Sequence, residues 1–395
     1  MHKYLPSPPV FKLFLFSGIV WAAVVGPLSA VLILKSFGVS SSFIGIFSAI
    51  CAVISIVCQP LWGLLGDKLA SPRKVLCFCL GSSAIFFGCV FLTDNLYIAA
   101  ALMILDVVFR CSVIGLLDSH TLTEVNVIPG LQYSHIRMAG SVSFGVLSLI
   151  NSSIINARGI MAIIPLSFCL AVLAVGWGLF AAKGQGEVCK IAAVQKEKSH
   201  LIKDAASLLS DKRYIVFIIF SALFAMSTQP LFHFLVYYVM EAGGRMGDAP
   251  MVQALRCAVE LPLFIFIGYL GKRLSAKKLM LAGVFFTFFY ITGLLFANSL
   301  FWLVICHFAG AAGFILCLAG RMRYVYDIAP KSVRSTSVTV MTACELGVGG
   351  AAGNLAGGFV LEIYGTQALT LAALAALLAA ALVLMGIKKS TNYTN

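Results

Sequence analysis

The sequence predicts an all-α membrane protein with twelve transmembrane helices in two pseudo-symmetric six-helix bundles. This fold class follows from the composition, the recurrence of long apolar runs, and a loop motif that occurs twice. Of the 395 residues, 61% are hydrophobic and only 11% are charged, and the mean hydropathy is +1.00. So little polar surface cannot coat a soluble globule of this length, and the expected solvent is therefore a lipid bilayer.

Apolar runs long enough to cross a bilayer recur along the chain with short polar breaks between them. A spanning helix needs about 20 mostly apolar residues, and a helix satisfies the backbone of each run within lipid. The first run is too long for the apolar core of a signal peptide and is expected to remain as a helix. The twelve predicted spans are Val10 to Leu34, Phe43 to Leu65, Val75 to Leu92, Tyr97 to Leu117, Ile136 to Ile155, Ile160 to Ala182, Tyr214 to Met240, Pro250 to Leu270, Leu279 to Ala297, Leu300 to Gly320, Ser335 to Leu361 and Gln367 to Ile387.

A long polar stretch from Lys183 to Arg213 divides six spans from six. We therefore expect an N-terminal bundle at residues 1–182, a cytoplasmic linker at 183–213, and a C-terminal bundle with a short tail at 214–395. Apolar residues between Leu201 and Leu209 recur at helical spacing, which predicts an amphipathic helix on the membrane surface within the linker.

The net charge of +13 is an orientation signal rather than a nucleic-acid-binding surface. With both termini in the cytoplasm, most of the 28 Lys and Arg residues fall in cytoplasmic loops, as in a bacterial-type inner membrane protein. The 12 cysteines show no zinc-like spacing, so no metal, cofactor or disulfide is expected. No phosphate-binding GxxxxGK loop and no room for a soluble catalytic domain appear, so we expect neither direct ATP use nor an enzyme.

The segment QPLWGLLGDKL, Gln59 to Leu69, places an acid, a base and a proline at the mouth of an apolar span. A weaker second copy, GYLGKRLSAKK, runs from Gly268 to Lys278. Two matching halves in a membrane indicate a transporter.

Three motifs in this order resemble the major facilitator superfamily over essentially the whole chain. Beside QPLWGLLGDKL, these are YSHIRMAGSVSF (Tyr133 to Phe144) and AGGFVLEIYGTQA (Ala356 to Ala368), which are similar to the lactose permease and phenylpropionic acid permease-like branch. The resemblance implies a secondary active transporter that works by alternating access, without cofactors and as a monomer. It also implies a gating turn at the cytoplasmic face, which here comprises Gly63, Asp67, Lys68, Arg73 and Lys74. In the second copy Lys272 stands where the first has Asp67, so the gating role is assigned to the first copy.

Charged residues within the spans are expected to mark the transport pathway, because each costs roughly 2.5 to 3.5 kcal/mol at mid-bilayer unless it is paired or solvated. Asp106 and Arg110 stand four residues apart, as do Arg256 and Glu260, a spacing that favours ion pairs on one helix face. By contrast, the stripe of Gly349, Gly353 and Gly357 predicts close helix packing.

Substrate-binding roles follow partly from the resemblance. In the similar permeases a carboxylate at the end of helix 4 and an arginine in helix 5 hold the solute, which implies this role for Asp118 and Arg137. Phe144, seven residues after Arg137, would offer an apolar face, and Arg110, Arg256 and His233 complete the predicted site. The alternatives are an interfacial salt bridge for Asp118 and Arg137 and plain packing for Phe144.

Proton coupling is assigned to Glu345, His307 and Glu260. His307 resembles the histidine of helix 10 in this branch. The predicted buried acids outnumber the bases by one, and no arginine lies in the span of Glu345, so this carboxylate would hold a proton. The alternative is a glutamate that only holds helix 11 in place.

The favoured function is proton-coupled symport of a small organic solute, with an organic or aromatic acid preferred over a sugar or nucleoside because arginines line the presumed path. One alternative is a proton-coupled exporter, which the absence of proline from Gly140 to Ile150 disfavours. A remote alternative is a non-transporting membrane sensor. The expected partners are the solute, protons and lipid, with no nucleic acid.

Overall fold

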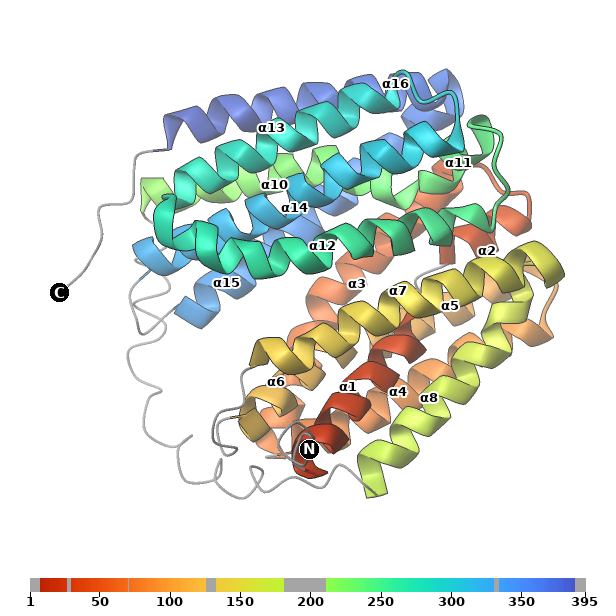
Figure 1. Ribbon diagram of the computed structural model, residues 1–395. Helices are drawn as coiled ribbons and strands as arrows, with labels where there is room; N and C mark the ends of the chain where they lie inside the picture. Colours follow the sequence, from red (N-terminus) through yellow and green to blue (C-terminus); the bar gives the residue numbers. More distant parts are fainter. Residues whose placement is uncertain are drawn as a thin grey trace, which may run out of the picture. The chain divides into compact units, whose positions relative to one another are not determined.

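The computed structural model describes residues 8–26, 30–69, 71–125, 133–180, 211–329 and 334–387, and this part of the chain is helical apart from short turns (Figure 1). Ten of the described helices are long and apolar enough to cross a membrane. One of them, Val340–Gly386, has 47 residues and is divided by a non-helical Gly365 at φ 80°, which glycine adopts readily. Helix α12 (Asp248–Arg273) has 26 residues and is also long enough, although it carries charges. These segments account for the twelve predicted spans.

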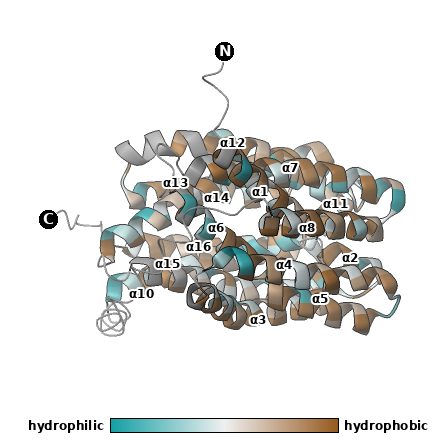
Figure 2. Ribbon diagram, turned by 90° about the horizontal axis from the view of Figure 1, so that it is seen from below, coloured by the Kyte–Doolittle hydropathy of each residue, from teal (hydrophilic) through white to brown (hydrophobic). Residues whose placement is uncertain are grey.

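Hydropathy along the helices agrees with a bilayer environment. Figure 2 shows apolar residues over most of the helix surfaces. Large apolar side chains such as Phe285, Val53 and Leu382 are more than half exposed, which a soluble protein would avoid but lipid favours.

The chain forms two compact units, and helix α3 (Ser41–Lys68) contributes to both. Unit 1 contains residues 1–38 and 54–196, and unit 2 contains residues 39–53 and 197–395. The main boundary, between residues 196 and 197, falls in the predicted linker. The amphipathic helix predicted within that linker lies outside the described residues.

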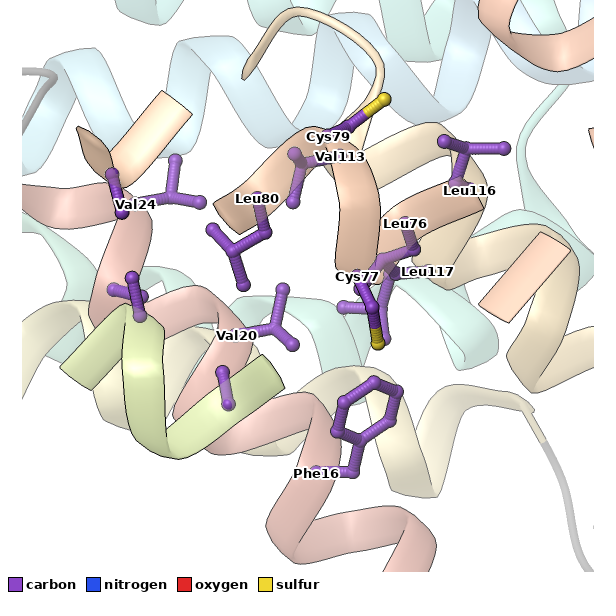
Figure 3. Close-up of a cluster of buried hydrophobic side chains, with 14 of the residues drawn as sticks. Phe16, Val20, Val24, Leu76, Cys77, Cys79, Leu80, Val113, Leu116 and Leu117 are labelled. Atoms are coloured by element: carbon purple, nitrogen blue, oxygen red, sulfur yellow. The ribbon is translucent and has the colours of Figure 1, made fainter. Parts of the chain in front are cut away.

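Unit 1 is built around an apolar core between α1 and α4. Phe16 and Val20 of α1 meet Leu76 and Leu80 of α4, and α6 adds Val113 and neighbouring residues (Figure 3). Helix α1 packs against α7 and α8, and α4 packs against α5, α6 and α8. The helices of this unit are α1 (Pro8–Val25), α2 (Ala30–Ser36), the second part of α3, α4 (Pro72–Cys89), η3 (Val90–Leu92), α5 (Leu96–Arg110), α6 (Val113–Val125), α7 (Tyr133–Arg158), η4 (Ile160–Ala162) and α8 (Ile163–Phe180).

Local sequence fixes several helix starts. Helix α4 begins at Pro72, since proline suits the first turn of a helix, and Asn95 caps α5 by accepting from the backbone N–H groups of Tyr97 and Ile98 at 2.9 and 3.2 Å. In unit 2, Ser275 and Ser299 cap α13 and α14 in the same way.

Unit 2 places α13 alongside α14 and α10 alongside α16 (Figure 1). Its helices are the first part of α3, α10 (Lys212–His233), α11 (Leu235–Glu241), α12, α13 (Ala276–Leu294), α14 (Leu300–Ile328), α15 (Arg334–Thr342), the π-helix η8 (Ala343–Gly350) and α16 (Ala351–Gly386).

The predicted glycine stripe packs against α10. A Cβ atom added to Gly349 would lie 2.1 Å from the carbonyl oxygen of Ala222, and one added to Gly353 would lie 2.8 Å from that of Met226. Only glycine allows so close an approach of two backbones, so the packing role predicted for this stripe is confirmed.

Candidate solute-binding site

Unit 2 holds a partly open cavity of about 180 Å³ among helices α10, α12, α13 and α14. Its lining mixes aromatic rings with uncharged polar groups and a single arginine. The lining residues are Phe224, Thr228, Gln229, Phe232, Arg256, Thr287, Tyr290, His307, Gly310 and Phe314. Convergent polar groups in an otherwise apolar cavity are typical of small-molecule sites.

The positive charge at this cavity is compensated. Arg256 donates from Nε to Glu260 Oε1 at 2.9 Å, which confirms the ion pair predicted from their spacing. Its guanidinium carbon lies 5.3 Å from the ring centre of Phe232 and 5.2 Å from that of Phe314, so two aromatic faces flank the group. The cavity therefore presents guanidinium N–H donors without a net charge.

His307 is held on both ring nitrogens. Its Nδ1 lies 2.8 Å from the carbonyl oxygen of Leu303, one turn earlier, and its Nε2 lies 3.3 Å from the hydroxyl of Tyr290 on α13. The imidazole is only 2% exposed. Gly310 leaves room for Tyr290, because a Cβ atom there would come within 3.0 Å of the tyrosine ring.

The corresponding charged pair of unit 1 lies beside a much smaller void. Arg110 donates from Nε to Asp106 Oδ2 at 2.8 Å, and the hydroxyl of Ser83 donates to Asp106 Oδ1 at 2.5 Å. The predicted Asp106 and Arg110 pair is thus confirmed. Arg110 lines a void of only about 10 Å³, which is no larger than one water.

The other predicted substrate residues are not among the residues that line this cavity. Arg137 stands over the ring of Trp21, 4.2 Å from its centre, while Asp118 and Phe144 are half-buried on α6 and α7. Half-buried His233, at the end of α10, hydrogen-bonds through Nε2 to the hydroxyl of Ser48 on the first part of α3. The roles of these four residues in substrate binding stay predictions.

Glu345 has a cationic partner, so the premise of an unpaired carboxylate was wrong. Its Oε2 lies 2.5 Å from Nη1 of Arg321 on α14. Arg321, which follows the predicted end of its span at Gly320, is fully buried inside α14 and lies over the ring of Phe224. Glu345 itself lies in the first turn of the π-helix η8. Charge imbalance therefore gives Glu345 no reason to hold a proton.

His120 lies past the predicted end of its span at Leu117, yet its side chain is 1% exposed on α6 and meets the ring of Phe16 edge-on at 5.9 Å. It follows Val113, Leu116 and Leu117 on one helix face, and this spacing is the signal that could have revealed its burial.

The predicted gating turn falls between α3 and α4. Arg73 is buried and donates to the carbonyl oxygen of Gly178, whereas Lys74 is exposed. Gly63 has open space around it. The side chains of Asp67 and Lys68 lie outside the described residues, and the gating role of the turn stays a prediction.

Several cavity residues were missed by sequence reasoning. Phe224, Thr228 and Phe232 recur every four residues on α10, so this mixed aromatic and polar stripe could have indicated an inward face. Tyr290 on α13 and Phe314 on α14 stand among many apolar residues, so the sequence alone does not distinguish the side of these helices that faces the cavity.

Membrane-crossing helices in two units, with a cavity of aromatic and polar side chains inside one of them, define a multi-pass membrane carrier of small molecules. Comparison with known families agrees with this class: the chain belongs to the MFS_1 like family, whose profile matches residues 11–372. The resemblance to the major facilitator superfamily is confirmed, and the chain is a transporter. The comparisons do not single out the lactose permease-like branch.

Known transporters are similar to this chain over nearly its whole length. The maltose permease of Geobacillus stearothermophilus is 22% identical over 358 residues, which covers 89% of this chain and 87% of the permease. A crystal structure of a variant of the nucleoside transporter NupG has a TM-score of 0.84 at 16% identity and covers 96% of this chain and 100% of its own. The crystal structure of a D-xylose-proton symporter has a TM-score of 0.75 at 11% identity and covers 98% and 100%.

Proposed function

We propose that the protein is a proton-coupled symporter that takes up a small, neutral, ring-bearing polar solute of the nucleoside or sugar type. It would act as a monomer in the inner membrane with both termini in the cytoplasm. Alternating access between its two halves would carry the solute.

The observation that carries this proposal is the compensated charge of the cavity. Arg256 is paired with Glu260, so a solute meets N–H donors and aromatic faces there rather than a positive field. An anion would gain little from such a pair, whereas hydroxyl or carbonyl oxygens can accept hydrogen bonds from it. A volume of about 180 Å³ lies below the roughly 300–1,000 Å³ of drug-sized sites, which favours a small solute.

The sequence favoured an organic acid because three arginines were expected along the path. Two of them, Arg110 and Arg256, each hold a carboxylate one turn away on the same helix, so they offer no net charge to an acid. The similarity to a maltose permease and a nucleoside transporter also favours a neutral solute.

Two of the predicted proton-coupling residues adjoin this cavity. His307 lines it, and Glu260 holds the arginine that lines it. A titratable group beside the solute lets the binding of one affect the binding of the other. The similarity to a D-xylose-proton symporter supports the same coupling.

The test is uptake by purified protein in liposomes with an acidic exterior, using radiolabelled uridine, D-xylose, maltose and 3-phenylpropionate. We expect accumulation of at least one neutral solute, little phenylpropionate, and loss of accumulation when a protonophore dissipates the gradient. Preferred accumulation of phenylpropionate would restore the organic-acid assignment. Release of preloaded solute against its gradient in the same liposomes, driven by the acidic exterior, would make the protein an exporter.

A matched pair of variants tests the charge argument. Glu260→Gln removes the compensating carboxylate and should raise the binding of phenylpropionate relative to neutral solutes. Asp106→Asn removes the equivalent carboxylate beside Arg110, away from this cavity, and should leave that preference unchanged. A preference that does not respond to Glu260→Gln would contradict the proposed role of the pair.

A further inference from the structure

The hydrogen-bond partner of His307 Nδ1 fixes where the ring carries its proton. Nδ1 lies 2.8 Å from the backbone carbonyl oxygen of Leu303, which can only accept. Nδ1 therefore carries a hydrogen in both the neutral and the charged ring. The proton that His307 gains or loses is the one on Nε2, which faces the hydroxyl of Tyr290 at 3.3 Å.

This arrangement couples the hydroxyl of Tyr290 to the charge of the ring. When His307 is neutral, Nε2 has a lone pair and the tyrosine O–H donates to it. When a proton binds at Nε2, the new N–H donates to the tyrosine oxygen, and the tyrosine hydrogen must turn away. Since Tyr290 lines the cavity, the freed hydrogen becomes available to a solute there.

The cavity is otherwise short of hydroxyl donors. The Thr228 hydroxyl donates to the carbonyl oxygen of Phe224 at 2.9 Å, and the Thr287 hydroxyl donates to that of Gly283 at 2.8 Å. Both threonines can still accept but not donate. A donor released from Tyr290 would therefore change what the described lining offers to a solute oxygen.

We propose that the Tyr290 hydroxyl couples solute binding to the protonation of His307. It donates a hydrogen bond to a hydroxyl or carbonyl oxygen of the solute only when His307 carries the proton. This inference rests on the proposed function and identifies Tyr290 as the residue that couples solute binding to proton binding. By linkage, the solute then binds more tightly to the protonated protein and in turn strengthens proton binding. That sign is the one symport requires, and an exporter exchanging solute for protons would need the opposite.

The charged and titratable groups around His307 are compatible with this role. From α12, Arg256 faces the cavity and is compensated by Glu260. From α13, Tyr290 is the partner itself, and the lining residues of α10 carry no titratable group. On α11, the hydroxyl of Tyr238 lies 2.7 Å from that of Thr370 and 3.2 Å from the carbonyl oxygen of Thr366.

The experiment is calorimetric binding of uridine, D-xylose and maltose to purified protein at about pH 4 and about pH 8, so that the acidic condition lies well below the ordinary histidine range. We expect the compound that binds to do so roughly three- to tenfold more tightly at the acidic pH, the effect of one added hydrogen bond. Tyr290→Phe keeps the ring against Gly310 but removes the hydroxyl, and should abolish the pH ratio. His307→Gln should abolish it as well, and the double variant should show no further change.

Tyr238→Phe is the matched control, because it deletes a buried hydroxyl of the same unit that does not line the cavity. In this variant the ratio of affinities at the two pH values should remain that of the native protein. A Tyr290→Phe protein with the native ratio, or native protein that binds more tightly at the alkaline pH, overturns the inference. Loss of binding by Tyr290→Phe at both pH values also overturns it, since the hydroxyl would then serve affinity alone. Native protein that binds none of the three solutes overturns the proposed solute class instead.

Discussion

Breaking the buried ion pair between Arg321 and Glu345 is expected to destabilise the folded protein by about 3 kcal/mol. Nη1 and Oε2 are 2.5 Å apart, the arginine is fully buried and the glutamate side chain is 12% exposed. At an effective dielectric constant near 20, two unit charges at this distance attract by about 7 kcal/mol, and desolvation of both ions offsets much of that. Removing one partner leaves a buried charge, which costs about 3–5 kcal/mol in protein interiors and about 2.5–3.5 kcal/mol at mid-bilayer.

The perturbation is Glu345→Gln, with Arg321→Met and the double variant completing a cycle. Each single variant should shift the folding equilibrium by roughly a hundredfold, whereas the double variant should lose much less than the sum of the two. The measurement is a denaturant titration that follows unfolding of the protein in detergent micelles. The partly exposed pair of Asp211 and Arg213, with side chains 26% and 35% exposed, serves as the control. Arg213→Met should cost less than about 1 kcal/mol.

Additive losses in the cycle would refute the reasoning, because they would show that Arg321 and Glu345 contribute independently. Native stability in both single variants would refute it as well. The role of Glu345 in proton coupling is a separate question: Glu345→Gln that retains gradient-driven accumulation would remove this residue from the coupling machinery.

Two further predictions concern helix packing and capping. Gly349→Ala places a Cβ atom 2.1 Å from the carbonyl oxygen of Ala222 and should lower the free energy of unfolding by at least about 1–3 kcal/mol. The control is Gly386→Ala, because a Cβ atom there has no neighbour within 4 Å. In the same denaturant titration, Gly386→Ala should leave the free energy of unfolding unchanged or raise it. Asp211 caps α10, and its hydrogen bonds with Arg213 hold the pKa of this carboxyl below its ordinary value. A carboxylate with a lowered pKa stabilises the fold at pH values above the ordinary carboxyl range, and this stabilisation is lost as the pH falls through the pKa of the folded state. Asp211→Ala should therefore lower the free energy of unfolding by about 1 kcal/mol at neutral pH and by less in acid.

Features set by local helix geometry could be predicted from the sequence. The twelve spans follow from apolar runs, and the pairs at Asp106 and Arg110 and at Arg256 and Glu260 follow from four-residue spacing, because one turn of helix brings such side chains together. The four-residue spacing of the glycine stripe likewise predicts its close contact with another helix, which is α10.

Features that depend on the register between helices could not be predicted. Arg321 and Glu345 lie on different helices, and Arg321 follows the predicted end of its span at Gly320. Yet Tyr324, Val325 and Ile328 continue the buried face on which Arg321 lies, so this helical period could have shown that the arginine is inside. The contact of Tyr290 with His307 joins α13 to α14 and leaves no such trace in the sequence.

We propose that a neutral solute and a proton enter together through the cavity of unit 2. This coupling is tested most directly by proton movement in liposomes that contain the purified protein and have no initial pH gradient, with valinomycin and potassium clamping the membrane potential. Adding the solute outside should make the exterior more alkaline, and Tyr290→Phe should weaken that signal while solute exchange persists. Solute entry without a pH change, or with acidification of the exterior, would contradict the account.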